Sequence, residues 1–221
     1  MIEYRSYDLY SIHCRSTLAG MNLGAPVLDV TPTVRGALLQ ALSRLEQPVT
    51  RRRLASAAGV SPGNASGVIE ELIGSGLVSE TAAGRSSMVA LNRNHLAAGP
   101  VLALAGLRGE LIRRLRERLS TWPDLLGAWV FGSVARGDAD SDSDVDVLIV
   151  VDDLGSPGLH ERVGQLHTDV RSWTGNDLQV VEHSQESWRK LIRAKNPLVE
   201  QVRLHGVALT AHTVAPRERH R

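Results

Sequence analysis

The sequence predicts an α/β (α+β) protein in which a basic N-terminal unit is joined to an acidic C-terminal unit. Residues 1–120 contain 14 arginines and 9 acidic residues, a net charge of +5. Residues 121–221 contain 11 basic and 15 acidic residues, a net charge of −4, so the overall charge of +1 conceals the division. Apolar residues at helical spacing followed by a hairpin pattern fill the first unit, whereas β-branched runs alternate with helical stretches in the second. These patterns predict two small folded units of different architecture.

The first unit has the element order of a winged helix-turn-helix. Apolar residues recur at helical spacing from Thr33 to Leu45. Thr50 is suited to cap a second helix, and Ser61 followed by Pro62 is suited to begin a third. The segments 77–79 and 87–91 flank a turn at residues 82–85 and predict a hairpin. We therefore expect this fold over residues 31–94, preceded by an N-terminal extension or arm over residues 1–30.

The excess of arginine in this unit predicts contact with DNA. The third helix has no arginine for reading guanine on its exposed face, so specificity is expected to be modest or to depend on a homodimer. A protein-docking role is the alternative, because winged helices also bind proteins. The residues expected to contact phosphates are Arg51, Arg52, Arg53 and Arg85, and those expected to face the groove are Ser61, Asn64 and Ser66.

A long helix is expected between the two units. Residues 95–120 place Leu104, Leu111, Leu115 and Leu119 on one stripe, with arginines around it. Such a helix can join the two domains or pair between subunits.

The C-terminal unit has five aspartates at alternate positions from Asp138 to Asp146. The first three are typical of a solvated loop. Asp144 and Asp146, in contrast, lie in a β-branched and aliphatic run that predicts a buried strand, and side chains two apart leave the same face. Carboxylates roughly 7 Å apart would repel each other unless a cation lay between them. An EF-hand is disfavoured because no frame in this run places glycine sixth and glutamate twelfth.

A second motif lies just upstream of the aspartates. The apolar segment 127–131 ends in Gly132 and Ser133, where glycine permits close approach of a ligand. Ser133 is expected to cap a short helix whose first amides point at an anion. No Gly-Lys-Ser/Thr follows, so this is not a P-loop. An anion site beside a divalent-metal site indicates a nucleoside triphosphate with magnesium.

The spacing of Gly132-Ser133, ten residues and then Asp144-x-Asp146 resembles the signature of the DNA polymerase beta nucleotidyltransferase superfamily, most closely its minimal and kanamycin-type branches. Ala135-Arg136-Gly137 and Ser143 also match the usual pattern there. The resemblance covers about residues 121–210. It implies a mixed sheet with helices over a domain expected at 121–212, with a flexible tail at 213–221. It further implies triphosphate binding by the Gly-Ser pair, two Mg²⁺ ions on the two aspartates, and a third carboxylate on a neighbouring strand.

Asp177 is the expected third metal ligand and base. It opens a predicted strand, whereas Glu182 near the other end points to the opposite face. The alternative is an exposed aspartate at the strand edge after a turn. The expected nucleotide-binding residues are Gly132, Ser133, Arg136 and Ser143, although an arginine at this place is as often simply solvated.

The resemblance implies Mg²⁺-dependent transfer of a nucleoside monophosphate from a nucleoside triphosphate, with ATP as the expected donor, to a hydroxyl acceptor. The acceptor could be a protein, a tRNA or a small molecule, and the DNA-binding unit suggests an antitoxin-like or autoregulatory role. One alternative is a transcriptional regulator that senses nucleotide without turnover. The other is an antibiotic nucleotidyltransferase, for which a winged helix is an unusual companion.

The remaining features predict a cytoplasmic protein. Cys14 is the single cysteine in the sequence, so no internal disulfide can form. The sequence has no secretory signal pattern and no apolar run of about eighteen residues, which a membrane-spanning helix would require.

Overall fold

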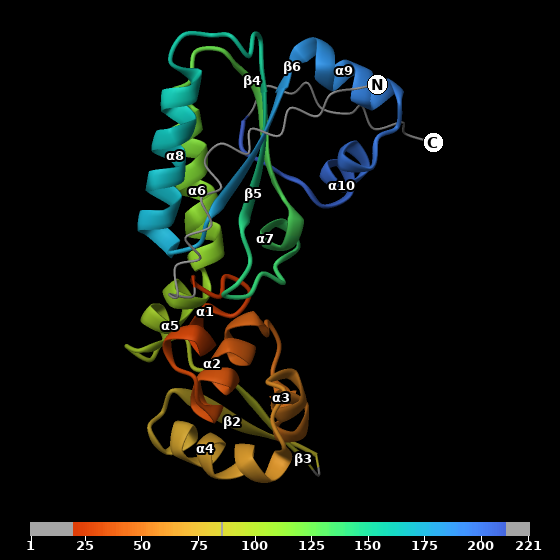
Figure 1. The fold of residues 1–221 in the computed structure, drawn as a ribbon. Helices are drawn as coiled ribbons and strands as arrows, with labels where there is room; N and C mark the ends of the chain where they lie inside the picture. The colour runs from red at the N-terminus through yellow and green to blue at the C-terminus, as the bar shows by residue number, and fades with distance from the viewer. Residues whose placement is uncertain (1–19, 85, 211–221) are drawn as a thin grey trace.

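The computed structural model describes residues 20–84 and 86–210, and Figure 1 shows two units arranged end to end. Two separate hydrophobic cores fill the C-terminal unit, one on each face of its sheet, and a third fills the N-terminal unit. The fold class is therefore the predicted α/β (α+β) arrangement with two distinct sheets.

The N-terminal unit is a winged helix-turn-helix, as predicted. A three-stranded sheet of order β1-β3-β2 packs beside three helices, and both neighbouring strand pairs are antiparallel. The hydroxyl of Thr50 accepts a hydrogen bond from the Arg53 amide, and that of Ser61 accepts one from the Asn64 amide, so both predicted caps are present. The elements are α2 (Val34–Arg44), β1 (Val49–Thr50), α3 (Arg51–Ala57), α4 (Pro62–Gly74), β2 (Val78–Ala83) and β3 (Ser86–Leu91).

The chain preceding this unit is not a free arm where it is described. Residues 20–25 lead into a short helix, α1 (Pro26–Val30). Val27 is buried in the N-terminal core, whereas Leu23 is buried in a core of the C-terminal unit. Part of the predicted extension therefore packs against both units, because its apolar residues fall opposite two different cores. The rest, residues 1–19, lies outside the described residues.

The single linker helix predicted over residues 95–120 is instead two helices. They are α5 (Ala98–Ala105) and α6 (Leu107–Leu119), separated at Gly106, whose φ of −86° and ψ of 1° are not helical. The Ala98 side chain is buried in the N-terminal core, and Leu111, Leu115 and Leu119 are buried in the C-terminal one. The interruption lets each helix follow its own core, which a leucine periodicity alone cannot reveal.

The C-terminal unit is built on a four-stranded mixed sheet of order β6-β5-β4-β7. The central strand β5 pairs with β4 antiparallel and with β6 parallel. Its parallel pairing requires a crossover, which α8 supplies. The strands are β4 (Leu125–Phe131), β5 (Val145–Val151), β6 (Leu178–Ser184) and β7 (Val207–Ala208); the helices are α7 (Gly132–Arg136), α8 (Leu159–Thr174), α9 (Gln185–Arg193) and α10 (Pro197–His205).

Helices cover both faces of this sheet (Figure 1). α6 and α8 pack on the face that carries Val147 and Ile149, whereas α9 and α10 pack on the face that carries Leu148 and Val150. β5 is therefore a continuous apolar run, as expected for a strand buried on both faces. In the described part of the chain, no helix combines the length and the apolar character needed to cross a bilayer.

Among the described residues, Trp188 of α9 is the largest fully buried side chain, and it packs against Trp129 of β4 with ring centroids 5.9 Å apart. We expect Trp188→Ala to destabilise the C-terminal unit by about 3–5 kcal/mol, because it removes a large buried side chain and leaves a cavity. Urea unfolding followed by tryptophan fluorescence and circular dichroism measures this change. Leu154→Ala, at a position that is 47% exposed, is the control and should change stability little. Equal losses in the two variants would contradict this packing.

Candidate active site

The two strand aspartates lie at the end of the C-terminal sheet nearest the winged helix-turn-helix. Asp146 is in register with Phe131 of β4 and with Gln179 of β6, and Asp144 immediately precedes β5. Residues two apart on a strand leave the same face, so Asp146 shares the α9/α10 face with Leu148. Asp146 is half-buried and Asp144 is exposed. The structure therefore brings together the first two predicted metal ligands.

The negative charge of the Asp146 carboxylate is only partly offset by its surroundings. Burial raises the pKa of its carboxyl, and the neighbouring Asp144 raises it further, whereas the Arg136 guanidinium opposes both effects. Arg136 itself forms an ion pair with Asp138, with 3.2 Å between Nε and Oδ2. The pair Asp144 and Asp146 thus favours a nearby cation, since a positive charge would relieve both burial and mutual repulsion.

Gly132 lies directly against Asp146. Its φ is +67°, in the left-handed region, and a Cβ at this position would lie 2.0 Å from Oδ2 of Asp146. Glycine is therefore required both by the backbone conformation and by the carboxylate beside it. The Gly-Ser corner and the aspartate pair, which ten residues separate in the sequence, therefore lie side by side.

Ser133 does not cap the short helix as predicted. α7 begins at Gly132 with Phe131 at its N-cap position, and no side-chain hydrogen bond caps it. Ser133 lies in the first turn, where its carbonyl oxygen accepts hydrogen bonds from the amides of Gly137 and Asp138. The helix starts two residues earlier than expected, at Gly132, whose left-handed conformation turns the chain.

Ser143 has a structural partner within the acidic loop. Its hydroxyl donates to Oδ1 of Asp140 at 2.7 Å and accepts from the Asp140 amide at 3.0 Å. The Asp142 amide also donates to Oδ1 of Asp140. These bonds lower the pKa of Asp140. Asp140 thus organises the loop, and the predicted role of Ser143 in nucleotide binding remains a prediction.

Asp177, the predicted third carboxylate, is directed to a different partner. Its carboxylate forms an ion pair with Arg171 near the end of α8. It also acts electrostatically on His167 of the same helix. Within residues 20–84 and 86–210, no group of three or more His, Cys, Asp or Glu side chains is arranged to hold a metal. The role of Asp177 as ligand and base therefore stays a prediction that this geometry does not favour.

Gln179 is the residue that sequence reasoning missed. It lies opposite Asp146 in the parallel β5/β6 pair, and its Nε2 is 3.5 Å from Oδ2 of Asp144. Gln179 carries an amide rather than a carboxylate, so the metal-ligand pattern does not mark it. The signal was the period of two, which places residues 177 and 179 on one face.

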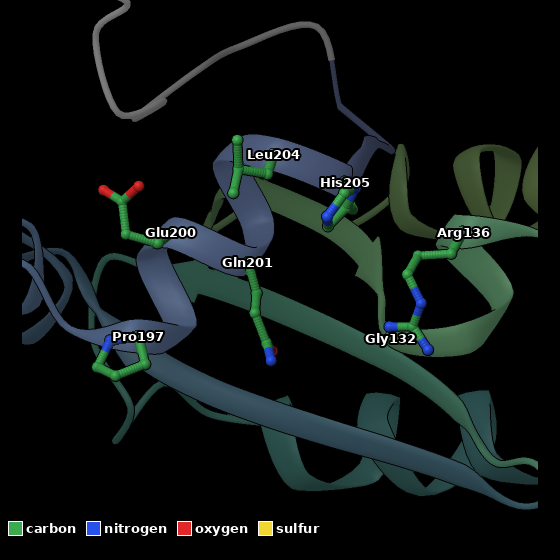
Figure 2. Close-up of a pocket in the computed structure, with 7 residues that line it drawn as sticks. All are labelled: Gly132, Arg136, Pro197, Glu200, Gln201, Leu204 and His205. Carbon is green, nitrogen blue, oxygen red and sulfur yellow. The ribbon is translucent and has the colours of Figure 1, made fainter.

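A pocket of about 350 Å³ adjoins this corner. Gly132 and Arg136 form one side and α10 forms the other (Figure 2). Figure 2 shows the Gln201 side chain extending toward the sheet, whereas Glu200 points away from it. The pocket is lined by Gly132, Arg136, Pro197, Glu200, Gln201, Leu204 and His205.

A pair of carboxylates is too few to hold a metal by protein ligands alone, but it suits magnesium. Mg²⁺ in proteins usually retains waters and is held by one or two carboxylates together with substrate phosphates. Asp144 and Asp146 supply those carboxylates, and Gly132 lets the backbone of the Gly-Ser corner lie directly against the Asp146 carboxylate. The donor set therefore fits a magnesium ion that arrives with a polyphosphate.

The residues predicted to contact DNA lie in different surroundings. Arg51 is held by the Glu80 carboxylate, with Nε–Oε1 2.8 Å and Nη2–Oε2 2.9 Å, and it also contacts Glu70. Arg52 and Arg53 are exposed on α3. Arg51 therefore joins α3 to the wing and to α4, and its charge is largely compensated within the fold.

The expected groove-facing residues lie at the start of α4. Asn64 and Ser66 are exposed, and Ser61 caps the helix. The exposed face of α4 also carries Glu70 and Glu71 and, as predicted, no arginine. Arg85 lies outside the described residues.

The nucleotidyltransferase domain family model matches residues 112–201. This span is a nucleotidyltransferase domain. It contains Gly132, Ser133, Asp144 and Asp146, together with the crossover helix and both central strands. The comparison with curated proteins gives no match.

Solved structures resemble parts of the chain only. A toxin-antitoxin crystal structure with AMP-PNP shares 22% identity over 46% of this chain and 71% of its own, with a TM-score of 0.31. The toxin-antitoxin MntA-HpeT mutant shares 22% over 47% of this chain and 72% of its own, with a TM-score of 0.32. The adhesin competence repressor AdcR from Streptococcus pyogenes shares 20% over 39% and 63%, with a TM-score of 0.29. Such low values carry no argument about function.

The contact between Gly132 and Asp146 can be tested with a matched pair of substitutions. We expect Gly132→Ala to destabilise the nucleotidyltransferase domain by more than the roughly 1–3 kcal/mol of a strained positive φ, because its Cβ also meets the carboxylate. Gly158→Ala is the control: its φ is +77°, but its Cβ would meet only the Arg162 side chain at 3.5 Å. Thermal unfolding of both variants measures the difference. Equal losses would show that only backbone strain matters.

Proposed function

We propose that the nucleotidyltransferase domain transfers a nucleoside monophosphate from a magnesium-bound nucleoside triphosphate, with ATP as the first candidate, to a hydroxyl acceptor. The observation that carries the proposal is the juxtaposition of the undercompensated Asp144/Asp146 pair with Gly132, which no side chain could replace. A polyphosphate with bound magnesium would place its metal ion at the two carboxylates and its phosphates beside Gly132. The acceptor class, whether protein, tRNA or small molecule, remains open, and an antitoxin-like or autoregulatory role is part of the proposal.

The residues of the chain have separable tasks in this reaction. Asp144 and Asp146 would hold up to two magnesium ions, which neutralise the triphosphate and stabilise the charge that develops during transfer. Gly132 and Ser133 allow the phosphates to approach the backbone of α7. Arg136, which already reaches toward this corner, would add positive charge beside the leaving pyrophosphate.

The pocket between α7 and α10 is the proposed seat of the ribose and base. It begins at Gly132, where the phosphates would lie, and runs along α10. The Gln201 amide can both donate and accept hydrogen bonds, so it is suited to meet a base edge. Proposed nucleotide binding thus accounts for the aspartates and the pocket together.

Nucleotide sensing without turnover is the second candidate. It is favoured by the ion pair between Asp177 and Arg171, which leaves the base predicted from the family resemblance engaged elsewhere. The two candidates share the same nucleotide site and differ only in chemistry. Binding and transfer must therefore be measured separately.

We expect Asp144→Ala and Asp146→Ala each to lower magnesium-dependent nucleotide affinity at least about 100-fold, since metal coordination supplies several kcal/mol. Isothermal titration calorimetry with ATP, GTP, CTP and UTP, with and without Mg²⁺, measures binding and base preference. Incorporation of labelled nucleotide into candidate acceptors measures transfer.

Asp142→Ala is the matched control, because this exposed aspartate belongs to the same acidic loop but lies outside the proposed ligand set. Binding without transfer to any acceptor would favour the sensor. Absence of nucleotide binding by the wild-type chain would refute both candidates.

We also propose that the winged helix-turn-helix binds DNA, with exposed Arg52 and Arg53 supplying phosphate contacts. Asn64 and Ser66 at the start of α4 would face the groove. Arg51 has the different task of holding the wing in place through Glu80.

For the arginines, we expect Arg52→Ala and Arg53→Ala each to reduce the salt dependence of DNA binding by about one unit of slope, as loss of one phosphate contact does. Arg51→Ala should instead lower the thermal stability of the unit, with a smaller change in slope. Fluorescence anisotropy with duplex DNA at several salt concentrations provides the measurement. A slope that is unchanged in the Arg52 and Arg53 variants would favour the protein-docking alternative.

A further inference from the structure

The acidic loop that precedes Asp144 is bound by a segment from the other end of the chain. The Gly24 amide donates to the Ala139 carbonyl at 2.7 Å, and the Gly20 amide donates to the Ser141 carbonyl at 2.9 Å. Ala139 is 2% exposed, so this contact is buried. Residues 20–25, which we call the N-terminal strap, therefore lie along the loop by backbone pairing.

Asn176 ties the strap to the residue just before the first aspartate. Its Nδ2 donates to the Ser143 carbonyl at 2.9 Å and to the Met21 carbonyl at 3.2 Å, while its Oδ1 accepts from the Met21 amide at 3.1 Å. The residue is 3% exposed, and a buried amide with these bonds is costly to displace. The Ser143 carbonyl is thus fixed by a side chain that is itself fixed by the strap.

The strap is also anchored in the winged helix-turn-helix unit. The Arg44 guanidinium on α2 donates to the Gly24 carbonyl, and Oε1 of the buried Gln40 accepts from the Val27 amide at 2.9 Å. Leu23, which immediately precedes Gly24, is buried in the core of the nucleotidyltransferase domain. A continuous chain of contacts therefore runs from α2 to the aspartate pair.

We propose that the N-terminal strap is a positioning element of the metal site and that Asn176 is its positioning residue, so that the winged helix-turn-helix unit sets the affinity of the site for magnesium. The proposal rests on the proposed nucleotide function.

The physical reason lies in how differently the two aspartates are held. Asp146 is fixed within β5 by pairing on both sides, whereas Asp144 stands before the strand, at the end of the loop that the strap binds. The distance between the two carboxylates therefore depends on the Ser143 peptide. Loss of groups that orient metal ligands typically lowers metal affinity about 10–100-fold.

Gly24→Ala tests the strap from the N-terminal side. A Cβ at Gly24 would lie 2.6 Å from the Ala139 carbonyl oxygen, so the backbone contact must open. Gly99→Ala, where a Cβ meets nothing within 4 Å, is the matched control. Calorimetric titration of the full chain with ATP at increasing Mg²⁺ is expected to show half-saturation at about tenfold or higher Mg²⁺ for Gly24→Ala, and no change for the control.

Asn176→Ala tests the same tie from within the domain. It is expected to raise the Mg²⁺ requirement similarly, while the affinity for ATP measured without Mg²⁺ should equal that of the wild-type chain. Asn92→Ala is its control, because the Asn92 amide also holds a backbone carbonyl, that of Gly76 at 2.8 Å, but far from the loop. A purely structural role would lower the unfolding temperature of both asparagine variants without shifting the Mg²⁺ requirement of either.

The outcomes separate this inference from the proposed function. If the wild-type chain does not bind ATP at any Mg²⁺ concentration, the proposed function fails. If the wild-type chain binds ATP with Mg²⁺ and the folded Gly24→Ala and Asn176→Ala variants need no more Mg²⁺, the strap inference is overturned while the function stands. Should both variants unfold, Arg44→Ala on the surface of α2 decides: a higher Mg²⁺ requirement supports the inference and an unchanged one refutes it.

Discussion

The repulsion between two carboxylates at the end of one strand is the constraint on which the C-terminal unit depends. Asp144 and Asp146 face the same side of the sheet, and burial of Asp146 adds to their mutual repulsion. A fold selected for stability alone would not place them there. Gly132, whose missing Cβ leaves space for the carboxylate, and Arg136, which partly offsets the charge, are arranged around this one unfavourable contact. The repulsion between the carboxylates lowers the stability of this corner, and the same repulsion favours a nearby cation.

Local sequence patterns predicted those features that depend on one short stretch of the chain. The period of two in β5 was sufficient to place Asp144 and Asp146 on one face, and the caps of α3 and α4 followed from Thr50 and Ser61. Sequence patterns gave no sign of contacts between side chains of different elements. Asp177 forms an ion pair with Arg171 of α8, which no sequence period encodes, and its role as metal ligand stays a prediction.

Interactions between the two units were the least accessible to sequence reasoning. The N-terminal strap has no amphipathic period, because its bonds to the acidic loop are made by backbone groups. In the sequence, Asn176 follows Gly175 and has the pattern of an ordinary turn residue. In the structure, however, its side-chain amide makes three long-range hydrogen bonds. Charge composition indicated two units, but it assigned the arginines of α6 to the N-terminal one, whereas α6 packs in the C-terminal core, and it gave no indication of how closely the units are joined.

The break at Gly106 determines where the polypeptide can be divided. α6 precedes the resemblance expected from residue 121, but the family model already begins within this helix, at residue 112, and the helix contributes Leu111, Leu115 and Leu119 to the core of the sheet. A fragment beginning at residue 121 would expose the apolar wall that these leucines cover, and it would also lack Leu23. A fragment beginning at residue 107 would keep these leucines but would still lack Leu23. No single cut therefore separates the N-terminal core from the cores of the C-terminal unit.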